Sequence, residues 1–220
     1  MDRALPLFFL QPSAQKEWLE QRLSCPAPFA ATGLSDGIRF PGREALAVPA
    51  AVLVPIINRP DGLTLLFTVR SSGLPDHAGQ ISFPGGRIEP EDVSVKGAAL
   101  REAREEIGLP EECVTILGEL SPYETVTGYR VTPIVGWVEP PFDLTPDPTE
   151  VAEVFEVPLA FVINEENHRR HFRMFGETRV EFWAITYEQH YIWGATAAMI
   201  LIFDRTLRLS AESSTLGDEQ

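Results

Sequence analysis

Apolar and polar residues alternate over short stretches of this chain, and these stretches surround one helix-like segment near residue 100. Residues 45–58 and 62–70 are rich in Val, Ile, Leu and Phe, and the Arg-Pro-Asp-Gly sequence between them suits a tight turn. We therefore expect a hairpin that ends near Arg70. Similar β-rich runs follow at residues 113–120, 130–138, 151–159 and 179–187. Strands on both sides of a central helix, with a closing helix over residues 193–209, predict an α/β protein with a mixed sheet between helices.

The pattern also divides the chain into three regions. Residues 1–45 are expected to form an N-terminal helical arm with an amphipathic helix over residues 13–23, and residues 46–207 to form the main domain. The polar residues 208–220 are expected to be a disordered tail. The opening apolar run contains Pro6 and lacks a convincing cleavage site, so we interpret it as a short helix or arm rather than a targeting signal.

The central helix has clear start and stop signals. Asp92 or Ser94 can cap its first turn, and Gly108 followed by Pro110 ends it, so the helix is expected over residues 93–107. Its apolar stripe consists of Leu100, Ala103 and Ile107 and predicts the face that packs on the core.

Three glutamates, Glu102, Glu105 and Glu106, fall within an arc of about 100° on the opposite, solvent-facing side of this helix. A solvated acidic face is the ordinary interpretation of such a cluster. The glycine-rich turn directly before the helix favours a different one, because it lets a ligand approach the backbone closely. Carboxylate oxygens at such a place suit Mg²⁺ or Mn²⁺, which hold phosphate oxygens while keeping several waters.

Composition narrows the classes of partner. With 220 residues and 44% hydrophobic content the chain can bury one core, and its formal net charge of −14 argues against a nucleic-acid groove. Cys25 and Cys113 show neither zinc-ligand spacing nor a disulfide framework, which is typical of a reduced cytoplasmic protein. No run approaches the roughly 18 to 20 apolar residues of a membrane span. We expect a soluble cytoplasmic protein without nucleic-acid or membrane partners, in which a polyanionic substrate would need local arginines or metal ions.

The stretch from Gly86 to Leu109 resembles the Nudix box, whose pattern is Gly, five residues, Glu, seven residues, Arg-Glu, an apolar residue, any residue, Glu-Glu, any residue, Gly and an apolar residue. Asp92 stands where the first Glu is expected, and eight residues rather than seven separate it from Arg101. This departure lies in the loop and helix start and leaves the glutamate face intact. The positions that fill the pattern are Gly86, Arg101, Glu102, Ala103, Glu105, Glu106, Gly108 and Leu109.

The resemblance implies a Nudix-type α/β/α sandwich and Mg²⁺- or Mn²⁺-dependent hydrolysis of a diphosphate by attack of an activated water. It implies that Arg101 orients a glutamate through a charge-assisted hydrogen bond. The implied metal ligands are Glu102, Glu105, Glu106 and the Gly86 carbonyl.

The general base in this family comes from the same helix, where Glu105 is the candidate, or from a later loop, where Glu150 and Glu153 stand. We prefer Glu150, because a polar, Pro-containing loop can swing over the metals more readily than the strand start that Glu153 is expected to occupy.

Residues 66–86 are similar to the segment that marks the coenzyme A pyrophosphatase branch of Nudix hydrolases, and the likeness extends over roughly residues 50–205. Phe67 replaces a Leu of that motif, and Pro75 replaces its second Arg, which exchanges a cation for a residue that cannot pair with phosphate. The matching positions are Leu66, Thr68, Arg70, Ser71, Gly79, Phe83, Pro84, Gly85 and Gly86.

This second resemblance implies cleavage of coenzyme A or acyl-coenzyme A to 4′-phosphopantetheine and adenosine 3′,5′-bisphosphate, by a homodimer. Other ADP-containing diphosphates, such as ADP-ribose or NADH, are the alternative substrates, and a non-catalytic nucleotide-binding module is a further alternative. The candidate substrate-binding residues are Arg70, His77, Gln80 and Gly85. For His77 a hydrogen bond that stabilises its own loop is an equal alternative.

Two other groups draw attention. The Arg169–Arg173 cluster is interpreted first as a solvated helix end or loop, and second as a source of the cation missing at Pro75. His168 and His171 lie among arginines without a third ligand and are expected at the surface. The C-terminal aromatics, Trp183, Tyr187, Tyr191 and Trp193, are expected in the core or at a subunit interface.

Overall fold

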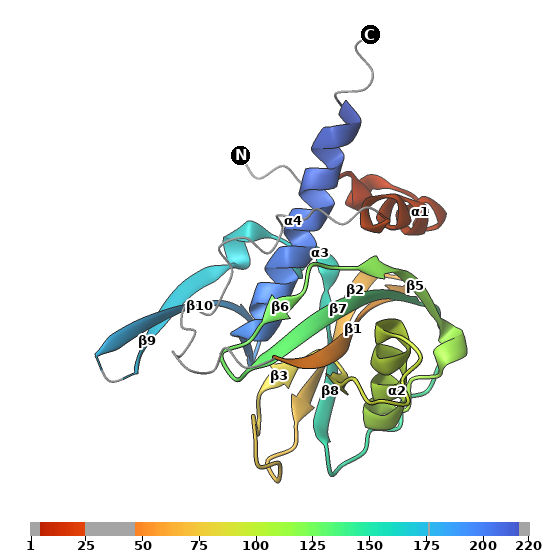
Figure 1. The fold of residues 1–220 in the computed structure, drawn as a ribbon. Helices are drawn as coiled ribbons and strands as arrows, with labels where there is room; N and C mark the ends of the chain where they lie inside the picture. Colours follow the sequence, from red (N-terminus) through yellow and green to blue (C-terminus); the bar gives the residue numbers. More distant parts are fainter. Residues whose placement is uncertain (1–4, 25–46, 176, 216–220) are drawn as a thin grey trace.

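The computed structural model describes residues 5–24, 47–175 and 177–215, and its centre is an eight-stranded mixed sheet (Figure 1). The path through the sheet runs β3-β2-β1-β7-β5, with β4 paired to β1, β6 to β7 and β8 to β2. The pair β1 and β7 is parallel, and the other pairs are antiparallel. The strands are β1 (Val48–Arg59), β2 (Gly62–Arg70), β3 (Ile81–Ser82), β4 (Gly85–Arg87), β5 (Val114–Glu119), β6 (Tyr123–Glu124), β7 (Tyr129–Val138) and β8 (Val151–Pro158).

A second, three-stranded antiparallel sheet follows in the order β11-β10-β9. Its strands are β9 (Arg169–Phe175), β10 (Thr178–Tyr187) and β11 (His190–Trp193), and the β9–β10 hairpin projects from the body of the molecule (Figure 1). The helices are α1 (Pro12–Leu23), α2 (Val95–Ile107), α3 (Leu159–Val162) and α4 (Ala195–Thr215), with 3₁₀ turns at Pro6–Phe9, Glu111–Cys113 and Glu165–Asn167.

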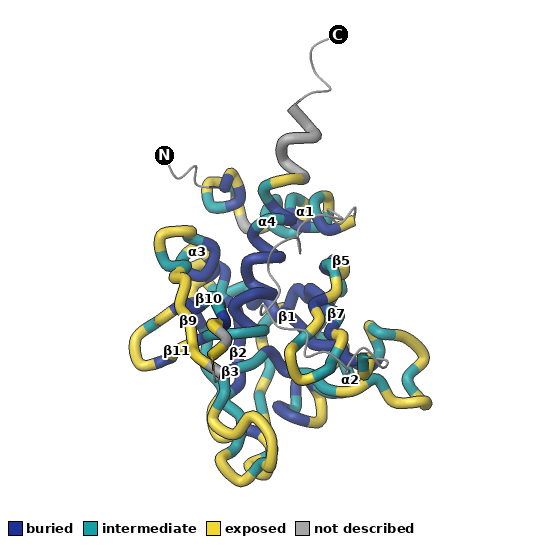
Figure 2. Tube along the Cα trace, turned by 60° about the vertical axis from the view of Figure 1, so that its left-hand side comes forward, coloured by how far each residue is buried: buried dark blue, intermediate teal, exposed yellow. Residues whose placement is uncertain are grey.

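Helices cover both faces of the large sheet. On one face α2 packs over Ala51, Leu53 and Leu66, and on the other α4 and α1 close a larger core around Phe67, Val54 and Ile56. Figure 2 shows α4 buried along the part that crosses the sheet, whereas β9 is exposed and β10 is mostly intermediate or buried. The predicted α/β sandwich with a mixed sheet is therefore the observed architecture.

Local signals placed several elements correctly. Arg59 pairs with Gly62 across the expected turn, and the hairpin ends at Arg70. Ser94, not Asp92, caps α2, since its side chain accepts a hydrogen bond from the Gly97 N–H, and Gly108 ends the helix in the left-handed conformation. The expected N-terminal helix is present as α1, where Leu19 and Leu23 are buried in the core under α4.

Two expectations were wrong. The Arg169–Arg173 cluster is neither a helix end nor a loop, because it forms β9 and pairs with β10. The closing helix continues to Thr215, so residues 208–215 are helical rather than disordered, and the remaining residues of the expected tail lie outside the described part. The division at residues 45 and 207 stays a prediction.

No described helix is both long enough and apolar enough to cross a membrane.

Candidate functional site

The turn that carries Gly85 and Gly86 is held against both β1 and α2. Gly86 pairs with Ala51 and Gly85 with Val52, and the Gly85 N–H donates a 3.1 Å hydrogen bond to Glu106 Oε2. A Cβ on Gly86 would lie 2.6 Å from the Glu102 carboxylate, so this carboxylate lies directly against the backbone of the turn. A glycine is required there for this close approach.

Small residues let α2 approach the sheet. Ala98, Ala99 and Ala103 are fully buried where the helix packs on β1 and β4. Because these residues add little bulk between helix and sheet, the glutamates at the edge of this buried face are brought within reach of the glycine turn.

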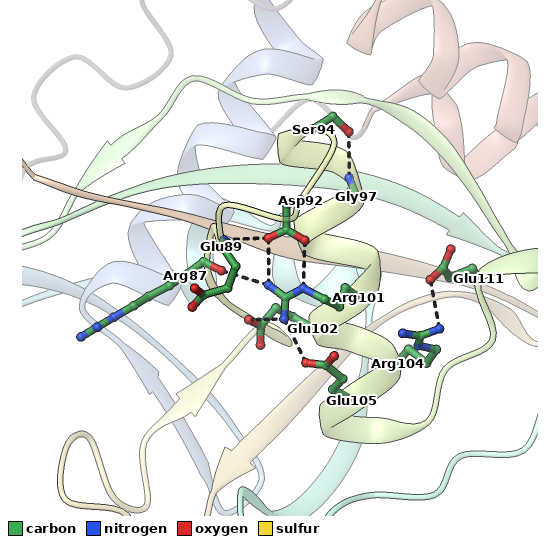
Figure 3. Close-up of polar contacts among 10 residues, drawn as sticks. All are labelled: Arg87, Glu89, Asp92, Ser94, Gly97, Arg101, Glu102, Arg104, Glu105 and Glu111. Atoms are coloured by element: carbon green, nitrogen blue, oxygen red, sulfur yellow. Dashed lines mark hydrogen bonds and ion pairs between the residues drawn. The ribbon is translucent and has the colours of Figure 1, made fainter.

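Arg101 connects the carboxylates of the site (Figure 3). Its Nε and Nη2 donate to the two carboxylate oxygens of Asp92 at 2.9 and 3.0 Å. Its Nη1 donates to Glu102 Oε1 at 3.0 Å and to Glu105 Oε2 at 2.9 Å, and Nη2 also donates to the Arg87 carbonyl at 3.1 Å. The guanidinium therefore fixes the two glutamates relative to the loop before the helix.

Asp92, whose role the sequence left open, is part of this charge cluster. The paired Arg101 guanidinium, with help from the Glu89 N–H, lowers the pKa of Asp92 to about 2. Asp92 thus stays ionised and holds Arg101 from outside the helix. The side chain of Asp92 is shorter than that of the expected Glu, and one extra residue separates it from Arg101. Both differences are compatible with a bidentate ion pair.

The helical pattern predicted that Glu106 faces solvent. This prediction was wrong, because Glu106 is only 3% exposed. Ala99 lies two helical turns before it on the same side of α2 and is fully buried, so the buried face is wider than the stripe of Leu100, Ala103 and Ile107. Burial raises the pKa of Glu106 to about 7, although the Gly85 N–H and Arg70 act in the opposite direction.

Arg70 is the nearest described cation to this buried carboxyl group, with Nη1 3.6 Å from Glu106 Oε1. Its Nε is buried and has no hydrogen-bond partner among the described residues. The side chain predicted to bind substrate therefore faces Glu106 at the inner edge of the site.

The loop before β8 returns to the end of α2. The Thr145 N–H donates to the Ile107 carbonyl and the Asp147 N–H to the Glu106 carbonyl, both at 2.9 Å. Burial is the main cause that raises the pKa of both Glu102 and Glu106, and the charge of Glu150, which is exposed at the end of this loop, adds to it. The loop thus brings Glu150 into the field of the helix glutamates.

Glu153, the alternative base, lies on the other face of the sheet. It pairs with Val69 in the β2–β8 register, and Val69 packs in the core under α4. Its Oε1 lies 3.0 Å from Nε2 of the buried His190. This arrangement separates Glu153 from the α2 glutamates.

His77 and Gln80 contact each other in the exposed loop between β2 and β3. His77 Nδ1 lies 2.9 Å from Gln80 Oε1, and the Gln80 N–H also bonds the His77 carbonyl at 3.1 Å. The loop-stabilising alternative for His77 is thus present, and contact of either residue with substrate stays a prediction.

His168 is partly buried rather than at the open surface, with Nε2 2.8 Å from the Val162 carbonyl, whereas His171 is exposed. Among the residues that the structure describes, no three His, Cys, Asp or Glu side chains already stand in a metal-binding arrangement. The chemistry of the donors nevertheless fits a hard divalent cation, because Glu102 lies against the Gly86 backbone and the buried Glu106 has one ion-pair partner among the described residues, Arg70. Glu102 and Glu105 would contribute to such a site through Glu102 Oε2 and Glu105 Oε1, the carboxylate oxygens that do not bond Arg101.

Comparisons with known proteins match most of this chain. A family model described as NUDIX domain matches residues 47–175. An uncharacterised Nudix hydrolase, NudL, of Photorhabdus laumondii is 46% identical over 155 residues, which cover 69% of this chain and 80% of that protein. A NudL of Escherichia coli O7:K1 is 44% identical over 152 residues, 69% of this chain and 78% of that protein. Among solved structures, the MutT protein from Methanosarcina mazei Go1 has a TM-score of 0.49 and 21% identity, over 76% of this chain and 96% of that one.

Proposed function

Because this chain belongs to the Nudix family and is similar to proteins named Nudix hydrolases, we propose that it hydrolyses the diphosphate bond of coenzyme A or acyl-coenzyme A. The products are 4′-phosphopantetheine and adenosine 3′,5′-bisphosphate. The observation that carries the hydrolase function is the contact between the Gly86 backbone and the Glu102 carboxylate, beside the buried Glu106.

The site would hold Mg²⁺ or Mn²⁺ through Glu102, Glu105, Glu106 and the Gly86 carbonyl. When bound, the cation supplies charge neutralisation on the diphosphate and lowers the pKa of a water. Arg101 keeps Glu102 and Glu105 oriented through its two Nη1 hydrogen bonds. Burial raises the pKa of Glu106, and a bound cation would favour its ionised form.

Glu150 is the proposed general base. It is exposed, acts electrostatically on Glu102 and Glu106, and stands on a loop that is bonded to the end of α2. A base so placed can take a proton from the attacking water directly or through one bridging water. The bond of Glu153 to His190 supports the choice of Glu150 over Glu153.

The coenzyme A motif supports the substrate, and Pro75 is its main departure. Arg70 and the Arg169–Arg173 cluster were the candidate replacements for the missing arginine. Arg70 faces Glu106, and Arg170 is engaged with Glu181 in the separate β9–β11 sheet, so neither location favours this replacement. If no other cation takes the role, ADP-ribose and NADH should be cleaved about as well as coenzyme A.

Rates of hydrolysis for coenzyme A, 3′-dephospho-coenzyme A and ADP-ribose test this function. We expect kcat/KM to be highest for coenzyme A and activity to disappear in excess chelator and return with Mg²⁺ or Mn²⁺. Equal values for the first two substrates would show that the 3′-phosphate is not recognised, and Pro75→Arg should then create a preference for coenzyme A. Full activity in chelator would exclude the metal-dependent mechanism.

We also infer that the protein is a cytoplasmic homodimer. The exposed Phe172 and Met174 on β9 and Tyr191 on β11 support an interface on the small sheet. Sedimentation at micromolar concentration should show about twice the chain mass of 24.4 kDa, and a species of single-chain mass alone would refute the dimer.

A further inference from the structure

Three arginines, Arg70, Arg87 and Arg101, lie around the Gly85–Gly86 turn and differ in how their charge is balanced. Arg101 is bonded to three carboxylates, and Arg70 faces the carboxyl group of Glu106. Arg87 is different, because its Nε and Nη2 donate to the neutral Tyr129 hydroxyl at 3.3 and 2.9 Å. No carboxylate of the described residues pairs with it. Its charge is therefore the one available to an anionic ligand.

We propose that Arg87, held in place by Tyr129, binds the 3′-phosphate of the substrate and supplies the cation that Pro75 has removed from the preceding loop. This inference rests on the proposed coenzyme A hydrolase function and adds a residue that determines its specificity.

Strand β4 places Arg87 on the other side of the turn from the carboxylates. Gly86 faces α2, as its contact with Glu102 shows, and side chains alternate along a strand. Arg87 pairs with Ala50, which packs in the core under α4, and its side chain extends away from the Arg101 cluster in Figure 3. A substrate whose diphosphate lies at Gly86 can therefore extend past the short β4 strand and present a second phosphate group to Arg87.

The loop that contains Pro75 acts electrostatically on this guanidinium. Asp76, the next residue, contributes to raising the pKa of Arg87, together with Tyr129 as the largest cause and Glu89. An arginine at position 75 would therefore stand in a loop whose charge already acts on Arg87. A nearby Asp76 also opposes a bound anion, which makes a preoriented guanidinium more important for selective binding.

Tyr129 gives the guanidinium a fixed orientation. The hydroxyl accepts two of its N–H groups, and Arg87 Cζ lies 5.6 Å from the Tyr129 ring centroid. Bonding through Nε and one Nη leaves the other Nη free of a described partner, so it can donate to a phosphate oxygen. Fixing the side chain before binding also reduces the entropy lost on binding.

The first experiment compares kcat/KM for coenzyme A and 3′-dephospho-coenzyme A in wild type, Arg87→Gln and Arg104→Gln. Arg104 is the matched control, since it is an exposed arginine on the far side of α2, paired with Glu111 (Figure 3). Arg87→Gln should lower kcat/KM for coenzyme A about ten- to a hundredfold, mainly through KM, and leave the dephospho form unchanged. Arg104→Gln should change neither.

The role of Tyr129 is tested in the same assay. Tyr129→Phe removes only the hydroxyl and should raise KM for coenzyme A without changing kcat. In the Arg87→Gln background it should have no further effect, because the hydroxyl acts through the arginine. An effect of Tyr129→Phe that persists in this background would assign it a structural role and contradict the proposed positioning.

Two outcomes separate the failure of this inference from that of the proposed function. If wild type prefers coenzyme A and Arg87→Gln keeps the preference, Arg87 does not bind the 3′-phosphate, whereas the coenzyme A function stands. If wild type does not cleave coenzyme A, the proposed function fails, and calorimetry with adenosine 3′,5′-bisphosphate and AMP still tests Arg87. A bisphosphate affinity about tenfold higher than that of AMP, lost in Arg87→Gln, would support it, and equal affinities in wild type would overturn it.

Discussion

The two faces of the large sheet are built on different principles. Under α4 the core consists of large side chains, and the rings of Phe83, Phe67, Phe155 and His190 stack in one continuous column with centroid distances of 4.9, 5.6 and 3.6 Å. Under α2 the helix contributes mainly alanines, and charged groups begin at the edge of the apolar contact. Large side chains thus fill the α4 face, whereas the α2 face brings a carboxylate close to the backbone of the glycine turn.

The difference indicates that one face of the sheet mainly provides stability and the other mainly provides activity. The α4 face holds the larger of the two apolar clusters, so most of the apolar burial that stabilises the sheet lies away from the site. The α2 face can therefore keep a nearly buried Glu106 and several glutamates close together, arrangements that cost free energy in the absence of a cation. Substitutions on the first face should change stability, and substitutions on the second should change activity.

The largest effect is expected from Phe67→Ala on the α4 face. Phe67 is fully buried between Phe83 and Phe155, so truncation removes both ring contacts and leaves a cavity. The free energy of unfolding should fall by about 3 to 5 kcal/mol, measured by urea unfolding. The folded fraction should keep wild-type kcat, with Phe67→Leu as a milder variant if Phe67→Ala does not fold. A loss below about 1 kcal/mol would contradict the assignment of this face to stability.

Glu106→Gln on the α2 face should show the opposite behaviour. The amide keeps the shape and can still accept the Gly85 N–H, so the urea midpoint should stay the same or rise. Metal-dependent kcat should fall about a hundredfold or more, which corresponds to about 2.7 kcal/mol of transition-state stabilisation. Glu111→Gln is the matched control, because it removes an exposed carboxylate whose ion-pair partner among the described residues is Arg104. Equal activity of the two variants would show that Glu106 is not part of the active site.

Substitutions of the adjacent Gly85 and Gly86 should separate effects on stability from effects on activity within one turn. A methyl group on Gly86 meets the end of the Glu102 side chain, which can turn away, so Gly86→Ala should lower kcat about tenfold with little loss of stability. On Gly85, at φ +156°, a methyl group would lie 2.4 Å from the Ala51 carbonyl oxygen, so Gly85→Ala should cost about 2 kcal/mol or more. Thermal unfolding and initial rates for both variants check the contrast, and a reversed pattern would refute it.

The smallest effect concerns the pH dependence of stability through Asp92. Its folded pKa of about 2 lies below the ordinary value near 3.8, so its stabilising contribution is complete above about pH 4 and is lost as the pH falls toward 2. Asp92→Asn should therefore be less stable than wild type at pH 7, and the difference should shrink between pH 4 and 2. Unfolding at several pH values measures this, with Asp92→Glu as the control that keeps the charge. A difference that does not vary with pH would show that the ion pair with Arg101 contributes nothing.

The sequence predicted the parts of the fold that local signals determine. The turn between β1 and β2, the Ser94 and Gly108 ends of α2 and the long strands β7, β8 and β10 all have residue patterns that specify them directly. Strands β3, β4 and β6 contain two or three residues, too few for an alternating pattern. The polar sequence of β9 resembles a loop, and only its pairing with β10 makes it a strand.

The candidate site was predictable as a set of residue types but not as an environment. The spacing of Glu102, Glu105 and Glu106 indicated one patch, yet the burial of Glu106 depends on how closely α2 approaches the sheet and on the loop beyond β7. The bidentate pair of Asp92 and Arg101 likewise depends on the path of the loop before the helix. No local pattern predicts either arrangement.

The hydrogen bonds from Thr145 and Asp147 to the last carbonyls of α2 limit which loops could be grafted into this protein from its relatives. The connection between β7 and β8 serves as the C-terminal cap of the helix, so its length is fixed at one end by the Ile107 and Glu106 carbonyls and at the other by the start of β8. A loop transplanted from a relative would have to keep the spacing between Thr145 and Glu150. A graft that ignores this spacing would leave helix carbonyls without partners and displace the proposed base, whereas longer segments inserted at the β9–β10 turn would disturb neither.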